Sequence, residues 1–351
     1  MPLFRCKEHV VDWSSGIAYF LGKLNDLLLS AGSVFSLTSL LCALCIAAGF
    51  IAVRRYRRNR PIRVRTIGRA LFPKRMFGAS TFTDVAYLYY NVFVHSLAFG
   101  WALLSYEYLT NGFIAGLVAV FGPVTPSALP TAVTQSVIIV ALFLGYEIGY
   151  WLQHWLCHRV PFMWQFHRVH HSAEVLTPLT NFRVHPVDSI VFANILAITA
   201  AVANGVTHYA LGDTTHQYAL SGTNIILIVF IHVYLHLQHT ELWIPFRGVL
   251  GRIFVSPAHH QVHHSDSPAH FNRNFGSCLA IWDWLFGTLY VPEKREQLHF
   301  GVEPDRFPAH TITGELIAPF IRAAAVLKPA PRVPEAQPSA LPQQQVDQLR
   351  A

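Results

Sequence analysis

Ten histidines of this chain fall into four clusters whose spacing suits metal ligation. They are His154, His158, His167, His170, His171, His236, His239, His260, His263 and His264. Residues three and four positions apart share one face of a helix, so each cluster would direct two or three imidazoles the same way. Neutral imidazole is a common ligand of iron, zinc and copper. Eight or more ligands exceed the needs of one zinc ion, so the pattern favours two metal ions between the helix faces.

A single pair of this kind would be explained equally well by interface histidines that bond to backbone or water. The clusters recur at the ends of apolar segments, where polar groups are costly and usually functional, and this recurrence favours a metal site. The sequence has no His-Glu-x2-His stretch of the zinc proteases. Oxygen chemistry on unactivated carbon needs a redox metal, so we expect iron, although zinc binds more tightly than Fe(II) in the divalent series.

The elements that must position these histidines are apolar helices. Apolar residues make up 52% of the 351 residues and charged residues only 13%, against roughly 25% charged in soluble domains. Uncharged runs long enough to cross a bilayer predict spans at 32–53, 86–106, 133–152, 189–211 and 218–237. The run 111–123 is short, with Gly and Pro at its ends, and we interpret it as a re-entrant or interfacial piece.

A block of arginines within 54–60 directly follows the first apolar run and contributes to the net charge of +7. This position favours a cytoplasmic loop near lipid headgroups over a nucleic-acid site. Counting crossings from this block places the clusters at 154–171 and 236–264 on the cytoplasmic side. If 111–123 also crossed the membrane, both of these cluster regions would move together to the opposite side of the membrane.

We therefore expect an all-α, polytopic membrane helical bundle of about four to five spans, with a cytoplasmic, histidine-rich helical cap that holds a dimetal site. Residues 1–75 would contain an amphipathic segment, the first span and the basic linker. Residues 76–300 would form the catalytic domain, with its core at 135–300. Residues 325–351 are rich in Pro, Ala and Gln, a composition typical of a disordered tail.

Around these histidines the sequence resembles the membrane-bound fatty acid hydroxylase and sterol desaturase superfamily. The motifs that carry the resemblance are His154-x3-His158, His167-Arg-Val-His170-His171, Phe182-Arg-Val-His185-Pro186, His260-Gln-Val-His263-His264, Asn274-Phe-Gly276 and Trp282-Asp283-Trp-Leu-Phe286-Gly287-Thr288. The resemblance implies a di-iron, O2-dependent enzyme that acts on a lipid. It assigns as ligands the eight histidines of the first, second and fourth of these motifs together with His239, while His236 is either a ligand or a supporting residue.

Two carboxylates are candidates for supporting the ligands. Glu147 lies seven residues before His154, on the same helix face, and would accept an imidazole N–H to fix the tautomer; the alternative is a packing carboxylate at an interface. Asp283 would act similarly or cap the turn 282–284. His185 precedes Pro186 in an extended segment, and both a ligand and a supporting role stay open.

The expected function is a lipid hydroxylase or desaturase that takes O2 and two electrons, a non-haem di-iron oxidoreductase. Because the sequence has neither a His-Pro-Gly-Gly haem segment nor a cysteine cluster for iron–sulfur, a separate ferredoxin or cytochrome b5-type donor is expected. The alternatives are a histidine-rich membrane metal transporter and a zinc-dependent lipid hydrolase. Sequence leaves the substrate open among sterols, fatty acyl chains and related lipids.

Overall fold

The computed structural model describes residues 13–125, 127–212, 219–220, 223–311 and 313–328, and this part of the chain is almost entirely helical. The expected tail at 325–351 lies mostly outside the described residues. The α-helices before the first histidine pair are α1 (Trp13–Leu29), α2 (Leu37–Tyr56), α3 (Val64–Leu71), α4 (Ala79–Tyr89), α5 (Ser96–Phe99) and α6 (Tyr106–Phe121). Those that follow are α7 (Thr131–Arg159), α8 (Pro161–His171), α9 (Pro186–Leu211), α10 (Ile225–Phe230), α11 (His236–Gln238), α12 (Gly248–Ile253), α13 (Pro257–His263), α14 (Ile281–Leu285) and α15 (Ala318–Val326).

Short turns of 3-10 and π-helix connect several of these helices. The 3-10 turns are η1 (Lys74–Phe77), η3 (Gly100–Ala102), η4 (Pro178–Phe182) and η6 (Pro268–His270), and the π-helices are η2 (Tyr90–His95), η5 (Ile231–Leu235) and η7 (Thr313–Ile317). The described strands are two residues long: β1 (Ala219–Leu220) pairs antiparallel with β2 (Thr223–Asn224), Ala219 opposite Asn224. The all-α expectation is confirmed.

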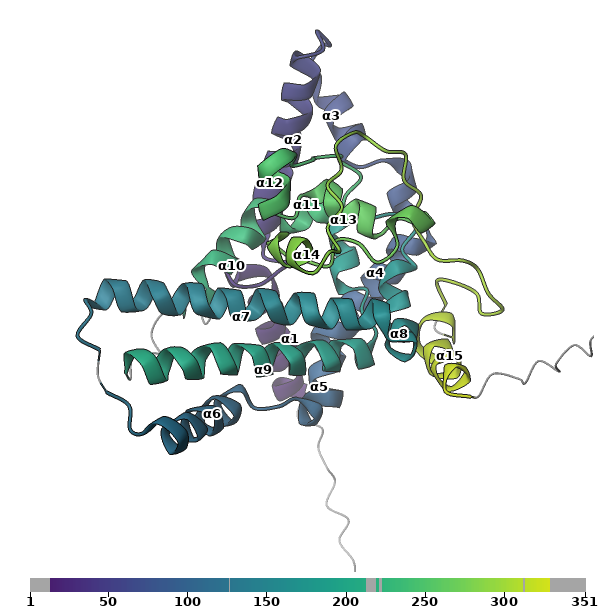
Figure 1. Ribbon diagram of the computed structural model, residues 1–351. Coiled ribbons are helices and arrows are strands. Elements are labelled where there is room, and N and C mark those ends of the chain that lie inside the picture. Colours follow the sequence, from purple (N-terminus) through teal and green to yellow (C-terminus); the bar gives the residue numbers. More distant parts are fainter. Residues whose placement is uncertain (1–12, 126, 213–218, 221–222, 312, 329–351) are drawn as a thin grey trace, which may run out of the picture.

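The helices α7 and α9 lie side by side, with α6 beside α9 (Figure 1). With 29 residues, α7 is about 44 Å long at 1.5 Å per residue. Glycines allow its close approach to α9: a Cβ at Gly145 would lie 2.8 Å from the Ala203 Cβ. Small residues four apart in the sequence are the usual means of close helix packing in membranes, and Gly145 and Gly149 have this spacing.

Four helical segments are long and apolar enough to cross a membrane: Leu37–Tyr56, Gly100–Phe121, Thr131–Arg159 and Pro186–Leu211. Three of them coincide with expected spans. The second corrects our interpretation of 111–123, because Ser105 accepts a hydrogen bond from the Tyr108 backbone N–H and begins the helix six residues earlier than expected. The expected span 86–106 is instead broken by η2 and η3, and the expected fifth span is the shorter helix Ile225–Gln238.

The shorter helices α11 to α14 gather beside the C-terminal half of α7, and α8 continues from its end (Figure 1). Phe143 of α7 packs with Phe230, Cys278 and Leu279. Ala258 and Val262 of α13 form a second apolar cluster with Trp243. These contacts attach the histidine-rich cap to the long helices and therefore determine where its side chains point.

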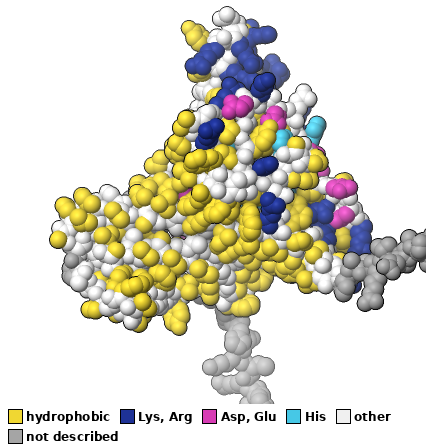
Figure 2. Space-filling model, in the orientation of Figure 1, with side chains coloured by type: hydrophobic (Ala, Val, Ile, Leu, Met, Phe, Trp, Pro, Cys, Tyr) yellow, Lys and Arg dark blue, Asp and Glu magenta, His cyan; other side chains and the backbone are white. Residues whose placement is uncertain are grey.

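The outer surface differs between the long helices and the basic end of α2 and α3. Apolar side chains cover the face of the long helices, and Lys and Arg gather around the far end of α2 and α3 (Figure 2). Large apolar residues remain exposed on these helices, for example Leu41 at 60% and Val206 at 47%. A surface of this kind suits a lipid environment.

Candidate metal centre

Nine of the ten predicted ligands converge in two adjacent groups. The first group is His154, His158, His167, His171 and His263; the second is His170, His239, His260 and His264. Within each group the candidate ligand atoms all lie within 4.8 Å of one another. The groups touch, because the ring centroids of His171 and His264 are 4.6 Å apart.

Each His-x2-His-His cluster divides between the two groups. His167 and His171, four residues apart, stay together, and so do His260 and His264. The third histidine of each cluster, His170 or His263, belongs to the opposite group. Adjacent residues differ by about 100° around a helix axis, so neighbours such as His170 and His171 face different centres. The two His-x2-His-His clusters therefore each contribute side chains to both groups.

In the first group the five Nε2 atoms are buried and form no hydrogen bond within the described chain. Three of the rings are held at Nδ1. His154 contacts the Phe275 carbonyl oxygen at 2.9 Å, His167 contacts Asp188 Oδ2 at 2.8 Å, and His263 contacts the Arg273 carbonyl oxygen at 2.8 Å. Because these acceptors require the proton on Nδ1, the Nε2 lone pairs are left facing the common centre.

In the second group the Nε2 atoms face each other directly. His239 Nε2 lies 3.3 Å from His170 Nε2, 3.2 Å from His264 Nε2 and 3.0 Å from His260 Nε2. A tetrahedron with metal–nitrogen bonds of about 2.0 Å has edges of about 3.3 Å. One cation at the centre would satisfy four lone pairs that cannot satisfy one another, so this donor set fits a metal ion.

Burial keeps these imidazoles neutral, the form that binds a metal. It lowers the pKa of His239 and of His263 to about 3. The pKa values of His170, His171, His260 and His264 are also lowered well below the usual range, first by burial and then by neighbouring histidines. The site is therefore ready to accept cations without first losing protons near neutral pH.

His236 is the one predicted ligand that the structure does not bring to either group. Its Nε2 lies 3.1 Å from the Ser39 Oγ of α2, so it joins α11 to α2. His185 also lies apart from the groups: its Nδ1 accepts from the Val187 backbone N–H and caps α9, and its Nε2 lies 3.2 Å from the Leu316 carbonyl oxygen. Both contacts are those of supporting residues.

The two predicted carboxylates hold backbone rather than imidazole rings. Glu147 accepts the Leu279 backbone N–H at 2.7 Å and the Cys278 backbone N–H at 3.2 Å. Asp283 accepts the backbone N–H groups of Phe275 and Gly276 at 2.9 and 2.8 Å. Since the Phe275 carbonyl oxygen contacts His154, Asp283 reaches that ring through one residue. Direct imidazole contact, our expectation for Glu147, does not occur.

Asp188 is the functional residue that our sequence reasoning missed. Besides His167 Nδ1 it accepts from Gln153 Nε2 at 2.6 Å, and the Cys157 Sγ lies 3.4 Å away. Cys157, His167 and Asp188 also meet the spacing of a small metal group, but the 2.8 Å contact between His167 and Asp188 is that of a hydrogen-bonded pair. The sequence signal that could have identified Asp188 is its position in the first turn of a helix that begins at Pro186.

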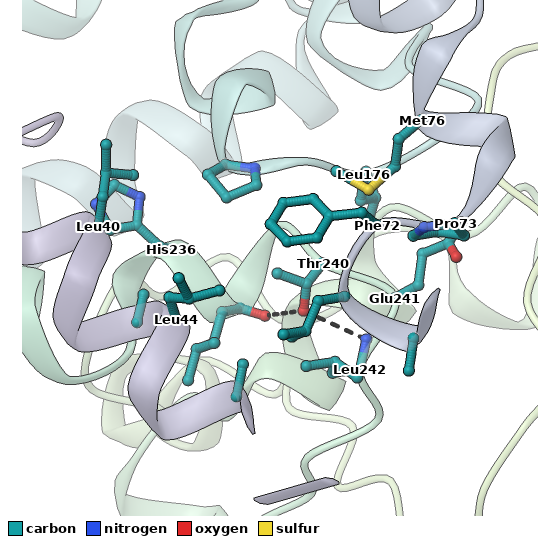
Figure 3. A pocket seen from close by; sticks show the side chains of 16 residues that line it. Leu40, Leu44, Phe72, Pro73, Met76, Leu176, His236, Thr240, Glu241 and Leu242 are labelled. Atoms are coloured by element: carbon teal, nitrogen blue, oxygen red, sulfur yellow. Dashed lines mark hydrogen bonds between the residues drawn. The ribbon is translucent and has the colours of Figure 1, made fainter. Parts of the chain in front are cut away.

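Two cavities of the described chain lie near the predicted ligands, and they differ in whether they reach the two histidine groups. A cavity of about 920 Å³ is lined by His158, His171, His263 and His264, so it opens onto both groups. A smaller apolar cavity of about 240 Å³ lies between α2, α3 and the segment 236–242, with Leu44, Phe72 and Met76 in its wall (Figure 3). His236 lines this second cavity, whereas none of the nine grouped histidines does. The larger cavity is therefore the one that gives access to the metal positions.

Comparison with known proteins agrees with this geometry. Residues 139–288 match the family model described as fatty acid hydroxylase. The chain is 32% identical over 145 residues to alkylglycerol monooxygenase of Xenopus tropicalis, covering 40% of this chain and 28% of that protein. It is 30% identical over 142 residues to ornithine lipid hydroxylase OlsE of Rhizobium tropici, covering 40% of this chain and 38% of that protein. No solved structure matches.

The alignments span well under half the length of these curated relatives. The family model matches the histidine-rich part of the chain. The matched segment contains the first two histidine clusters, His239 and the last cluster. Every histidine of the two groups thus lies inside the matched residues. Through this segment, the chain is similar to the fatty acid hydroxylase family, which supports the expected resemblance to the fatty acid hydroxylase and sterol desaturase superfamily.

Proposed function

We propose that this protein is a membrane-embedded oxidoreductase that hydroxylates a lipid with O2 at a centre of two iron ions. The observation that carries the proposal is the convergence of nine imidazoles, eight of them in buried residues, in two touching groups at the wall of one large cavity. The relatives' names, a monooxygenase of alkylglycerols and a hydroxylase of ornithine lipids, support a lipid substrate. The catalytic unit would be 76–300, with its core at 135–300.

The overall reaction is R–H + O2 + 2 electrons + 2 protons → R–OH + H2O. Bound iron would supply the redox chemistry that activates O2. The chain supplies neutral Nε2 donors, fixes three rings through Nδ1, and gives the lipid a place beside both groups. If hydrogen is removed from two neighbouring carbons instead, the product is an alkene and both oxygen atoms leave as water, so desaturation uses the same centre.

The two electrons come from outside the chain in this proposal, from a ferredoxin or a cytochrome b5-type protein. We place the metal centre on the cytoplasmic side. The support for this side is the arginine content of the last turn of α2, Arg54 and Arg55, and of α3, since positive residues favour the cytoplasmic ends of spans.

The test combines metal content with O2 consumption on anaerobically purified protein. We expect about two iron ions per chain, in line with two ligand groups, and O2 uptake that depends on an added reductant and membrane lipid. Mass spectrometry should find a lipid product heavier by one oxygen atom or lighter by two hydrogen atoms.

The matched variants are His170→Ala, in the second group, and His299→Ala, an exposed histidine outside both groups. Loss of iron and of lipid oxidation in the first alone supports the proposal. Zinc-loaded protein that hydrolyses lipids without O2, and that stays inactive towards O2 after reconstitution with iron, would instead indicate a hydrolase. Metal uptake into proteoliposomes that depends on His154 would indicate a transporter.

A further inference from the structure

The 920 Å³ cavity is lined both by histidines of the two groups and by charged residues, which we call its rim: Arg168, Asp266, Glu303 and Asp305. The Nε2 atoms of His171 and His263 are buried, without a hydrogen-bond partner in the described chain, and their side chains line the cavity. Each of these residues is only 5% exposed. These two nitrogens belong to the first group, so the cavity leads to the proposed metal centre.

The rim of the same cavity carries more negative than positive charge. Its lining includes the acidic residues Asp266, Glu303 and Asp305 and the single basic residue Arg168. Arg168 is already occupied, because its guanidinium pairs with Asp305 at 3.3 Å and also donates to the Glu303 carbonyl oxygen. Within the described residues the carboxylates of Asp266 and Glu303 form no ion pair, and both residues are exposed.

Apolar side chains also line this cavity. Trp164, Phe271 and Phe300 line the cavity, and Phe271 is 55% exposed. A lipid whose polar head meets the carboxylates would therefore rest its first methylene groups on aromatic rings. An arrangement of a mostly apolar wall with a few placed polar groups is the usual design of a selective ligand cavity.

Resting on the proposed function, we infer that the lipid binds with its polar head at the carboxylates of the rim and its chain towards the histidines, and that this head is neutral or cationic. A phosphate monoester head would meet the unpaired carboxylates of Asp266 and Glu303 with no free cation to receive it, and like charges in contact disfavour binding. A hydroxyl or ammonium head would instead donate hydrogen bonds to them.

This placement of the head also limits which carbon is oxidised. A sphere with the volume of this cavity, 920 Å³, is about 12 Å across. The head and the metal-facing nitrogens lie within that one cavity, so the reacting C–H bond lies near the polar head and not at the far end of a long chain.

The test uses three lipids that share one saturated alkyl chain and differ in the head: glycerol, glycerol phosphate, and glycerol esterified with an amino acid. Equilibrium binding to the metal-loaded protein is measured without O2, so that no turnover occurs. We expect the phosphate lipid to bind about tenfold more weakly than the other two. In the double variant Asp266→Asn, Glu303→Gln this difference should fall below about threefold, with metal content unchanged.

The control variant is Glu293→Gln, which removes an exposed carboxylate outside the cavity lining and should keep the full discrimination. Equal binding of all three lipids, no binding of any, or discrimination that survives the double variant would overturn the inference. Fragmentation of the oxidised product locates the new oxygen, and a position far along the chain also contradicts it. Binding in the expected order without any oxidation would count against the proposed function and leave the head preference standing.

Discussion

At the scale of single residues, the centre depends on where each imidazole carries its proton. His154, His167 and His263 are each held at Nδ1 by an oxygen within 2.9 Å. The Nδ1 atoms of the second group, His170, His239, His260 and His264, have no such partner among the described residues. The first group is therefore the better oriented of the two, and its ion should be released last when a chelator is added.

The Asp188→Asn substitution tests this orientation directly. It preserves shape but removes the carboxylate charge that holds His167 at 2.8 Å. We expect metal affinity at the first group to fall by about 10- to 100-fold, the usual cost of losing such a partner. Competition with a chromophoric chelator measures it. Asp26→Asn, at an exposed position of α1, is the control and should leave affinity unchanged; equal affinity in both variants would contradict the assignment.

At the scale of elements, the centre depends on helices that meet at close range. Asp188 of α9 contacts Gln153 of α7 at 2.6 Å and His167 of α8 at 2.8 Å, so the packing of α9 against α7 and α8 decides whether Asp188 reaches His167. Gly145 permits the contact: a Cβ there would also lie 3.1 Å from the Thr199 carbonyl oxygen. Neither the Ala203 methyl group nor a backbone oxygen can rotate away, so an added side chain must separate the helices.

Gly145→Ala is accordingly expected to destabilise the protein by about 1–3 kcal/mol, the usual cost of overpacking, and to weaken metal binding as Asp188 moves away. Gly116→Ala in α6, where a Cβ would meet nothing within 4 Å, should change neither. Both effects are measured by unfolding in detergent and by the same chelator competition. A stable Gly145→Ala variant with full metal affinity would show that α7 and α9 tolerate separation.

A buried arginine joins three other elements behind the second group. Arg183 is 0% exposed and pairs with Asp84 of α4 at 3.1 Å and with Glu315 of η7 at 2.9 Å. Its Nε donates to the Val169 carbonyl oxygen, the residue before His170, at 3.0 Å. The backbone that directs His170 is thereby tied to α4 and η7.

Removing this arginine should cost far more than removing an exposed one. Arg183→Met leaves two buried carboxylates without a counter-charge, so we expect a loss of about 3–5 kcal/mol in the free energy of unfolding. Arg252→Met, at an exposed position of α12, should stay within about 0.5 kcal/mol. Denaturant titration in detergent compares the two. A loss below about 1 kcal/mol for Arg183→Met would show that the ion pairs do not stabilise this region.

At the scale of the whole molecule, a lipid-facing surface surrounds an interior filled with neutral histidines (Figure 2). This has a consequence for pH. In the folded, metal-free protein the pKa of His239 and of His263 is about 3, whereas an unfolded histidine titrates near 6.5. Below pH 6.5 the unfolded chain therefore binds protons that the folded chain excludes, and stability falls as pH decreases.

We expect the midpoint of thermal unfolding of chelator-treated protein to fall steadily from about pH 6.5 towards pH 3. The unfolding midpoint of metal-loaded protein should stay constant over the upper part of this pH range, because the bound ions keep the imidazoles deprotonated. Melting curves of both forms in detergent across this range provide the measurement. A flat profile for the metal-free form would mean that the folded imidazoles take up protons as readily as those of the unfolded chain.

The sequence alone predicted the candidate ligands and the membrane class of the protein. Spacings of three and four residues identify helix faces wherever a helix forms, and all nine grouped histidines came from such spacings. Uncharged runs likewise indicated the membrane class, because a hydrocarbon core excludes charge whatever the fold. Both signals are local, and local patterns can be read directly from the chain.

Only the tertiary structure decided which histidines share a centre and what holds them. His170 and His171 are neighbours in sequence but face different groups. The ring of His170 packs against His239 of the second group, and that of His171 packs against His158 of the first. The contact from Asp188 to His167 and the diversion of His236 to Ser39 depend equally on how helices pack. Such contacts are set by packing between segments distant in the chain, and no local spacing contains that information.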